Sequence, residues 1–272
     1  AERSDLRAAV GELLGQRCTE ADVRRVIATD DGFDRDLWAQ LADQGVPGML
    51  VADRYGGMGF GALELEAVAE ETGKALLPAP FISSAVLTVT LLSAAGSEDD
   101  RQRLLPALAD GTAIGTVAVT GESGTWTPAG IGERADADGT LTGTAHYVTW
   151  GQIADVLLVV ARTGEDVGVF EVAPDADGFR RTAATVFDPT TPLSTFTFSA
   201  TPARRIGTAG WEAVQTALDH AVLAGAAEQV GGARRIFDMT VDYLKTRIQF
   251  GRPIGSFQAL KHMAADLLLE VE

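Results

Sequence analysis

The residues best suited to chemistry in this 272-residue sequence lie near its C-terminal end. Arg247 is followed by Phe250, Gly251 and Ile254, and then by Gln258. An arginine at the end of a helix can present its planar fork to a carboxylate or a pyrophosphate. The nearby aromatic ring and carboxamide suit a heterocycle. The spacing leaves a second interpretation open, in which the segment is a helix–helix corner whose arginine caps backbone carbonyls.

Two helices are expected to position these residues. Apolar side chains recur at helical spacing over residues 211–248, a break follows at 251–253, and a second helix is predicted to begin near Ser256. This second helix carries three consecutive leucines at 267–269 and is predicted to continue to Glu272. An isolated helix of this kind needs a surface on which to dock. We therefore expect either further helices or another chain to supply that surface.

The rest of the chain divides into a helical first part and a β-rich middle. Residues 5–110 show helical periodicity, and Ser97, followed by acidic residues, is predicted to open one of the helices. From Thr112 the period is 2, which predicts strands at 112–120, 141–148, 156–162, 167–172 and 194–198. Strands without intervening helices favour an antiparallel sheet or small barrel. The predicted fold is α+β: an N-terminal α-helical domain over residues 1–111, a middle antiparallel β-sheet or barrel domain over 112–207, and a C-terminal helical bundle, incomplete within the given residues, over 208–272.

Composition excludes several classes of function. The formal net charge of −16 would repel a phosphate backbone, so nucleic acid is not expected as a main partner. No signal segment is visible, and the longest apolar stretch, 81–95, is too short to span a membrane, so we expect a soluble, cytoplasmic protein. The single cysteine, Cys18, is interpreted as structural. The glycines of residues 55–61 are mis-spaced for a dinucleotide-binding loop and predict a tight turn. No metal site is predicted.

The C-terminal segment resembles the signature of the acyl-CoA dehydrogenase family, in which Arg-x-x-Phe-Gly-x-x-Ile-x-x-x-Gln follows a long helix. Other resemblances occur in the same order as in the family. Residues 37–61 and the Glu-Glu-Thr-Gly of 70–73 look like its N-terminal helical region. Residues 117–120 and 143–149 look like the two flavin-contacting strands of its middle domain. The resemblance covers essentially the whole chain.

The resemblance implies that the protein binds FAD through seven residues: Val119, Thr120, Tyr147, Thr149, Arg247, Phe250 and Gln258. The two threonines would hydrogen-bond the isoalloxazine ring, and the tyrosine would flank it. The arginine, phenylalanine and glutamine would reach the pyrophosphate and adenine end of an FAD held mainly by a neighbouring subunit. The family likeness further implies an acyl-CoA thioester substrate, an electron-transfer flavoprotein, and a homotetramer or a heterotetramer with a related subunit.

Two departures from the family pattern bear on the reaction. Family members usually follow the first flavin threonine with Glu-Pro and a Gly-Ser-Asp turn, whereas residues 120–128 here read Thr-Gly-Glu-Ser-Gly-Thr-Trp-Thr-Pro. The family's catalytic glutamate normally lies well beyond the position of Glu272, and its alternative place on the long helix holds Ala221 and Val222. Glu228 is interpreted as a polar-face or interface residue. No catalytic base is therefore predicted in this chain.

The predicted function is α,β-dehydrogenation of an acyl-CoA, with steroid side-chain thioesters among the candidate substrates, to a trans-enoyl-CoA. Two alternatives remain open. The chain could be a non-catalytic, flavin-binding subunit of a heteromeric dehydrogenase, which the altered segment after Thr120 favours. It could also be an oxygen-using flavin monooxygenase on the same fold.

Overall fold

The protein is described by a computed structural model that covers residues 2–272. Its first part is helical, as predicted, with α1 (Glu2–Arg17), α2 (Glu20–Ile27), α3 (Arg35–Asp43), α4 (Ala62–Ala75), α5 (Val89–Ala95) and α6 (Glu98–Ala109). Ser97 caps α6 through a reciprocal pair of bonds with Asp100, which confirms the predicted start of that helix. The glycine-rich segment forms a tight turn after the short helix η1 (Asp53–Tyr55), with Gly56 and Gly59 at positive φ.

The apolar stretch 81–95, which lies within the segment of predicted helical periodicity, contains a change of helix type. A π-helix, η2 (Phe81–Thr88), precedes α5. The Thr88 hydroxyl donates to the carbonyl of Ser83, five residues earlier, at 2.7 Å. The Ser84 hydroxyl accepts the backbone N–H of Gly115 at 2.9 Å. These contacts stabilise the wider helix. They depend on side-chain hydroxyls and on a partner from the sheet. Hydrophobic periodicity reports neither of these, so it does not predict the change of helix type.

The middle part is a curled eight-stranded sheet in the order β6–β7–β3–β2–β4–β5–β8, with β1 beside β4. Its strands are β1 (Gly115–Ala118), β2 (Arg134–Ala135), β3 (Thr140–Thr149), β4 (Val156–Thr163), β5 (Asp166–Val172), β6 (Phe179–Ala183), β7 (Leu193–Pro202) and β8 (Arg204–Arg205). Most pairs are antiparallel, but β1 and β2 each pair with β4 in parallel. The sheet is thus mixed rather than purely antiparallel, because the chain crosses over through β2 and β3 before it returns beside β1.

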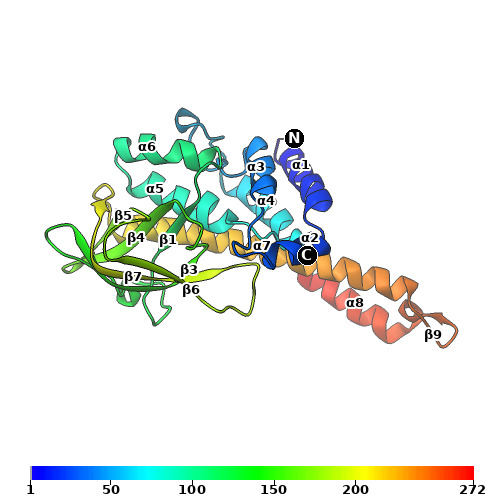
Figure 1. Cartoon of the computed structure of the whole chain (residues 1–272). Helices are drawn as coiled ribbons and strands as arrows, with labels where there is room; N and C mark the ends of the chain where they lie inside the picture. Colours follow the sequence, from blue (N-terminus) through cyan, green and yellow to red (C-terminus); the bar gives the residue numbers. More distant parts are fainter. Residues whose placement is uncertain (1) are drawn as a thin grey trace.

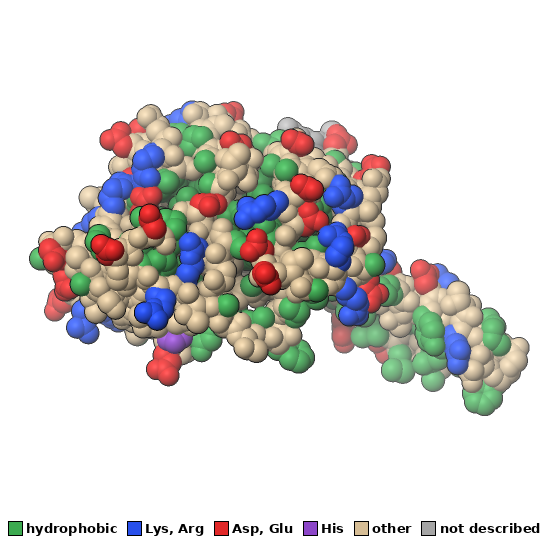
Figure 2. All heavy atoms as spheres, viewed as in Figure 1, with side chains coloured by type: hydrophobic (Ala, Val, Ile, Leu, Met, Phe, Trp, Pro, Cys, Tyr) green, Lys and Arg blue, Asp and Glu red, His purple; other side chains and the backbone are tan. Residues whose placement is uncertain are grey.

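One helix, α7 (Trp211–Thr246), connects the sheet end of the molecule to a projecting hairpin (Figure 1). The hairpin contains β9 (Ile248–Gln249), β10 (Arg252–Pro253) and the short helix η4 (Ile254–Ser256), after which α8 (Gln258–Val271) returns along α7. Figure 2 shows apolar side chains on the surface of this projection. The exposed ones are Ile236, Met239, Tyr243, Ile248, Phe250, Met263, Leu267, Leu268 and Leu269. The predicted docking of the second helix is therefore partial within this chain.

Helices α4 and α7 cross at two glycines. A Cβ atom on Gly73 would lie 2.0 Å from the carbonyl oxygen of Glu228, and a Cβ on Gly231 would lie 2.0 Å from the carbonyl oxygen of Glu70. Any larger residue at either position would force the two backbones apart. The crossing is thus set by residues that lack side chains.

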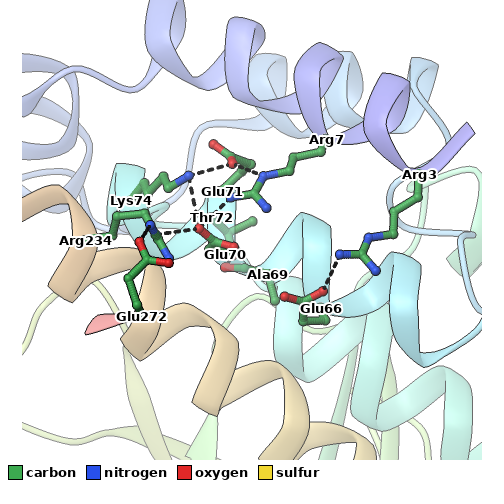
Figure 3. A network of polar contacts seen from close by, with 10 residues as sticks. All are labelled: Arg3, Arg7, Glu66, Ala69, Glu70, Glu71, Thr72, Lys74, Arg234 and Glu272. Carbon is green, nitrogen blue, oxygen red and sulfur yellow. Dashed lines mark hydrogen bonds and ion pairs between the residues drawn. The ribbon is translucent and has the colours of Figure 1, made fainter. Parts of the chain in front are cut away.

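An ion-pair network lies beside this crossing and joins four helices (Figure 3). Its centre is the Glu70 carboxylate, whose Oε1 lies 2.5 Å from Arg7 of α1, 3.2 Å from Lys74 of α4 and 3.3 Å from Arg234 of α7. Arg234 also binds Glu272, next to α8, at 2.9 Å. Burial by itself would raise the pKa of Glu70, but Lys74 and Arg7 outweigh it and hold that pKa below its ordinary value.

Across residues 2–272, no helix combines the length and the apolar character needed to cross a membrane. The buried core spans all three parts of the chain, since Trp38 of α3, Phe196 of β7 and Ala224 of α7 belong to one hydrophobic cluster. The helical and β-rich parts therefore hold the site residues against a shared core.

Candidate functional site

The structure brings Thr120, Tyr147 and Thr149 together on one part of the sheet. Thr120 forms a β-bridge with His146, whose backbone N–H donates to the Thr120 carbonyl at 2.8 Å. The hydroxyl of Thr116, on β1, donates to the carbonyl of Thr149 at 2.6 Å. Residues distant in the sequence thus become neighbours through pairing between β3 and the β1 segment. Val119 lies beside them, but its side chain is buried in an apolar cluster, which leaves its backbone as the available contact.

Tyr147 has a backbone conformation that is uncommon for a residue with a side chain. Its φ is 58°, and it lies at an irregularity of β3 between Ala145 and Val148. A non-glycine residue at positive φ carries strain, and such strain concentrates at functional sites. The ring is half exposed and lies against Gly124, while the hydroxyl donates weakly to the carbonyl of Glu122 at 3.4 Å. The protein thus presents one face of an aromatic ring.

A loop from Gly121 to Gly132 backs both Thr120 and Tyr147. The Thr120 hydroxyl donates to the carbonyl of Thr125 at 3.1 Å, and the N–H of Gly121 donates to the carbonyl of Gly130 at 2.8 Å. This is the segment in which the sequence departs from the family. Its glycines let the backbone fold closely: a Cβ on Gly130 would lie 1.9 Å from the Thr125 carbonyl oxygen. The Tyr147 ring is half exposed and Thr149 is partly buried, whereas the Thr120 side chain is buried beneath this loop.

The second group of predicted residues, Arg247, Phe250 and Gln258, lies on the projecting hairpin. Arg247 follows α7, Gln258 opens α8, and the N–H of Ile254 donates to the Arg247 carbonyl at 2.8 Å. Within the described residues the Arg247 guanidinium caps no carbonyl and pairs with no carboxylate. Phe250 is 90% exposed and has a φ of 52°. The corner interpretation, in which the arginine only caps carbonyls, is therefore not what the structure shows.

The two groups do not meet within one chain. The sheet lies beside the first part of α7, and the hairpin lies beyond the opposite end of this 36-residue helix (Figure 1). At 1.5 Å per residue, α7 is about 54 Å long. We call these two predicted groups of residues half-sites, and within one chain they face different surroundings.

The positions considered for a catalytic base either lack an ionisable side chain or use it in a structural contact. Ala221 is buried and Val222 exposed, and neither can take up a proton. Glu228 lies two helical turns further along α7, where its carboxylate binds the Thr72 hydroxyl of α4 at 2.8 Å. Burial raises the pKa of Glu228 to about 7. The interpretation of Glu228 as an interface residue agrees with this geometry.

Sequence patterns missed a buried glutamate near the loop. Glu133 is fully buried, its Oε2 accepts the N–H of Gly132 at 3.1 Å, and its Oε1 has no hydrogen-bond partner among the described residues. Burial raises the pKa of Glu133 to about 7. Nothing in its local sequence distinguishes it from a surface glutamate, because its burial results from strand pairing. Cys18 is also buried, and burial raises the pKa of its thiol to about 11, which agrees with its structural interpretation.

Comparisons with known proteins agree with the fold. The family model described as "Acyl-CoA dehydrogenase, N-terminal domain" matches residues 1–112, and "Acyl-CoA dehydrogenase, C-terminal domain" matches residues 208–272. Acyl-CoA dehydrogenase IpdE2 of Mycolicibacterium smegmatis is 33% identical over 276 residues, which cover 99% of this chain and 73% of that protein. Acyl-CoA dehydrogenase FadE27 of Mycobacterium tuberculosis is 34% identical over 272 residues, which cover 98% of this chain and 71% of that protein.

Two solved structures resemble the chain over 99% of its length. The ChsE4–ChsE5 complex from Mycobacterium tuberculosis aligns with a TM-score of 0.89 and 33% identity, over 73% of the matched chain. A structure entitled "Tcur3481-Tcur3483 steroid ACAD G363A variant" aligns with a TM-score of 0.87 and 33% identity, over 74% of the matched chain. Both titles name two different components.

Proposed function

The chain belongs to the acyl-CoA dehydrogenase family, and we propose that it is a flavin-binding subunit of a heteromeric dehydrogenase that oxidises a bulky acyl-CoA thioester. The proposal includes FAD as cofactor, an electron-transfer flavoprotein as electron acceptor, and the seven residues named above as contacts to flavin. It also keeps the three predicted domains, with boundaries near 111/112 and 207/208. The starts of β1 at Gly115 and of α7 at Trp211 support these boundaries.

The observation that carries this proposal is the separation of the two half-sites. Thr120, Tyr147 and Thr149 can contact an isoalloxazine ring at the sheet, whereas Arg247 and Gln258 stand at the far end of α7. A complete site then needs the hairpin of one subunit beside the sheet of another. The apolar side chains of α7 and α8 support this assembly, because large exposed apolar surfaces mark interaction sites.

A related but different subunit is favoured as the partner. The two structural relatives at 33% identity are described in their titles as a complex of ChsE4 with ChsE5 and as a Tcur3481–Tcur3483 pair. The Tcur3481–Tcur3483 protein is described as a steroid ACAD, which supports a ring-bearing acyl group in preference to a short linear one.

The reaction needs removal of a proton from the α-carbon, which the thioester carbonyl acidifies, and departure of the β-hydrogen as hydride. When bound, FAD supplies the hydride acceptor. The part of this chain is to orient: Thr120 and Thr149 offer hydrogen bonds at the edge of the ring, Tyr147 flanks it, and Arg247 offers a bidentate contact to a pyrophosphate. The α-proton needs a carboxylate, and Ala221, Val222 and the Thr72-bound Glu228 do not provide one.

The lack of a carboxylate base at these three positions favours the second candidate function, a non-catalytic subunit whose partner supplies the base. The catalytic and the non-catalytic subunit both require FAD. They differ in which subunit provides the carboxylate on which turnover depends. Both predict that the isolated chain stays at background with acyl-CoA substrates.

The test is to co-express the chain with a related subunit and to measure bound flavin by absorbance. Turnover is then followed with an artificial electron acceptor and a panel of linear and steroid side-chain acyl-CoA thioesters. We expect flavin bands in the complex and turnover of ring-bearing substrates. A folded complex that shows no flavin bands after addition of FAD would contradict the proposal.

A further inference from the structure

Arg162, on β4, binds the backbone of the loop that follows Thr120. Its Nη2 donates to the carbonyl of Pro128 at 2.6 Å, and its Nε donates to the carbonyl of Ile131 at 3.4 Å. Its backbone N–H also donates to the carbonyl of Glu133 at 2.9 Å. Arg162 thus contacts two positions in the last part of the loop and the residue that follows it.

Arg181, on β6, binds the segment that follows Thr149 in the same way. Its Nη1 lies 3.0 Å from the carbonyl oxygen of Gly151, 3.1 Å from that of Gln152 and 3.0 Å from that of Ala154. Three carbonyl groups therefore converge on one guanidinium nitrogen. The segment begins with Trp150, whose φ of 58° also places it in the left-handed region.

Neither arginine has the usual partner of a half-buried guanidinium. Within residues 2–272 neither forms an ion pair, in contrast to Arg204, which binds both Asp100 and Glu171. Hydrogen bonds that involve a charged group are stronger than those between neutral groups, so such bonds to carbonyls can hold an irregular loop in one conformation. The rigid fork of arginine allows one side chain to serve several carbonyls, which a lysine ammonium cannot do with the same geometry.

The loop held by Arg162 leads directly to the expected flavin contacts. Between its ends, the Thr125 carbonyl accepts from the Thr120 hydroxyl, and Gly124 lies against the Tyr147 ring. A shift of the part of the loop that contains Pro128 would also move Gly130, whose carbonyl accepts the N–H of Gly121. The loop position and the direction of the Thr120 side chain are therefore coupled through backbone contacts.

We propose that Arg162 and Arg181 are positioning residues of the flavin face, each fixing the loop that follows one of the two threonines. The inference rests on the proposed function, since it assumes that Thr120, Tyr147 and Thr149 contact flavin. Arg162 lies on β4 and Arg181 on β6, two strands that β7, β3 and β2 separate in the sheet. Each acts on the loop backbone and touches neither cofactor nor substrate.

The test uses the co-expressed complex with Arg162→Lys, Arg162→Gln, Arg181→Lys and Arg181→Gln. Apo-complex is titrated with FAD at low temperature, and flavin fluorescence and the visible spectrum of the bound flavin are recorded. We expect each variant to raise the Kd for FAD at least tenfold and to shift the spectrum, with the lysine variants close to the glutamine ones. Hydrogen exchange of residues 121–132 and 150–155 in wild-type apo-complex should show protection before FAD is added.

Arg103→Gln is the control, because Arg103 makes an ion pair with Glu171 and contacts neither loop. It should lower thermal stability without changing the Kd. Variants of Arg162 and Arg181 that lower stability as Arg103→Gln does, but keep the wild-type Kd and spectrum, would overturn the inference and leave the proposed function intact. Rapid exchange of both loops in wild-type protein would overturn it as well, even if the variants fail to fold. A wild-type complex that takes up no FAD would overturn the proposed function and this inference together.

Discussion

The hydroxyl of Thr72 lies 2.8 Å from Oε1 of Glu228, which joins α4 to α7 across 156 residues of sequence. This contact uses a carboxylate that lies on the same face of α7 as Ala221, two helical turns away. It lies beside the glycine crossing of the two helices, where Gly73 meets the Glu228 backbone. Glu228 thus belongs to the packing of the helices, and its ionisation affects stability.

Glu228→Gln should stabilise the protein at alkaline pH. The folded-state pKa of about 7 lies above the ordinary value of 4.5, so the folded protein binds the proton more tightly than the unfolded chain does. The stability that this group contributes is present below about pH 4.5 and is lost as pH rises through 7. Glutamine keeps an acceptor for Thr72 and carries no charge. We expect a gain on the order of 2–3 kcal/mol at pH 8, measured by urea unfolding.

Glu228→Asp is the control, since it keeps a titratable carboxyl and should keep the loss of stability at high pH. Glu133, whose pKa is also raised to about 7, keeps part of the pH dependence in both variants. Dehydrogenase turnover of the complex should survive Glu228→Gln. Abolished turnover in a folded Glu228→Gln complex would identify Glu228 as the base after all.

Glu70→Gln should destabilise the helical part. The substitution removes the carboxylate that, among the described residues, pairs with all three of Arg7, Lys74 and Arg234. The cations keep partners in Glu71 and Glu272, so the cost falls toward the lower end of the about 3–5 kcal/mol that loss of one member of a buried pair carries. Because the three cations are partly exposed, we expect a loss near the lower end of that range in urea unfolding. Glu66→Gln is the matched control from the same helix: its pair with Arg3 is exposed, so the loss should stay below about 1 kcal/mol. Equal losses in the two variants would show that the network is not cooperative.

Gly231→Ala should weaken the crossing of α4 and α7. The added methyl group would lie 2.0 Å from the Glu70 carbonyl oxygen, so one helix must shift, and overpacking of this kind costs about 1–3 kcal/mol. Gly225→Ala, on the same helix, meets no atom within 4 Å and should stabilise by about 0.5–1 kcal/mol. Thermal unfolding of both variants checks the pair, and a stabilised Gly231→Ala would mean that the two helices are further apart than described.

Arg247→Ala should release FAD while the chain stays folded. If the guanidinium binds a pyrophosphate across the subunit interface, its loss removes charge-assisted hydrogen bonds worth a factor of about 10–100 in affinity. FAD titration of the co-expressed complex measures this factor, and circular dichroism checks the fold. Arg235→Ala, an exposed arginine of α7, should leave the Kd within twofold. A monomer by light scattering that still holds FAD tightly would contradict the shared site.

Local sequence signals were sufficient for most of the helices and for the longer strands. The capping pair at Ser97, the helical period before the break at Gly251, and the alternating strands depend on neighbours in the chain, so their residues can be identified without a structure. Spacing alone left the role of Arg247, Phe250 and Gln258 open, and the resemblance to the family motif made them predicted flavin contacts.

Only the tertiary structure decided the features that depend on distant partners. The parallel pairing of β1 with β4, the π-helix that contacts Gly115, the bond between Thr72 and Glu228, and the burial of Glu133 join residues that sequence periodicity cannot relate. The same holds for Arg162 and Arg181, which look like ordinary strand arginines until the loops fold over them. The family resemblance predicted two groups of flavin contacts, but the length of α7 decided that they lie at opposite ends of the molecule, because a continuous helix keeps its ends apart.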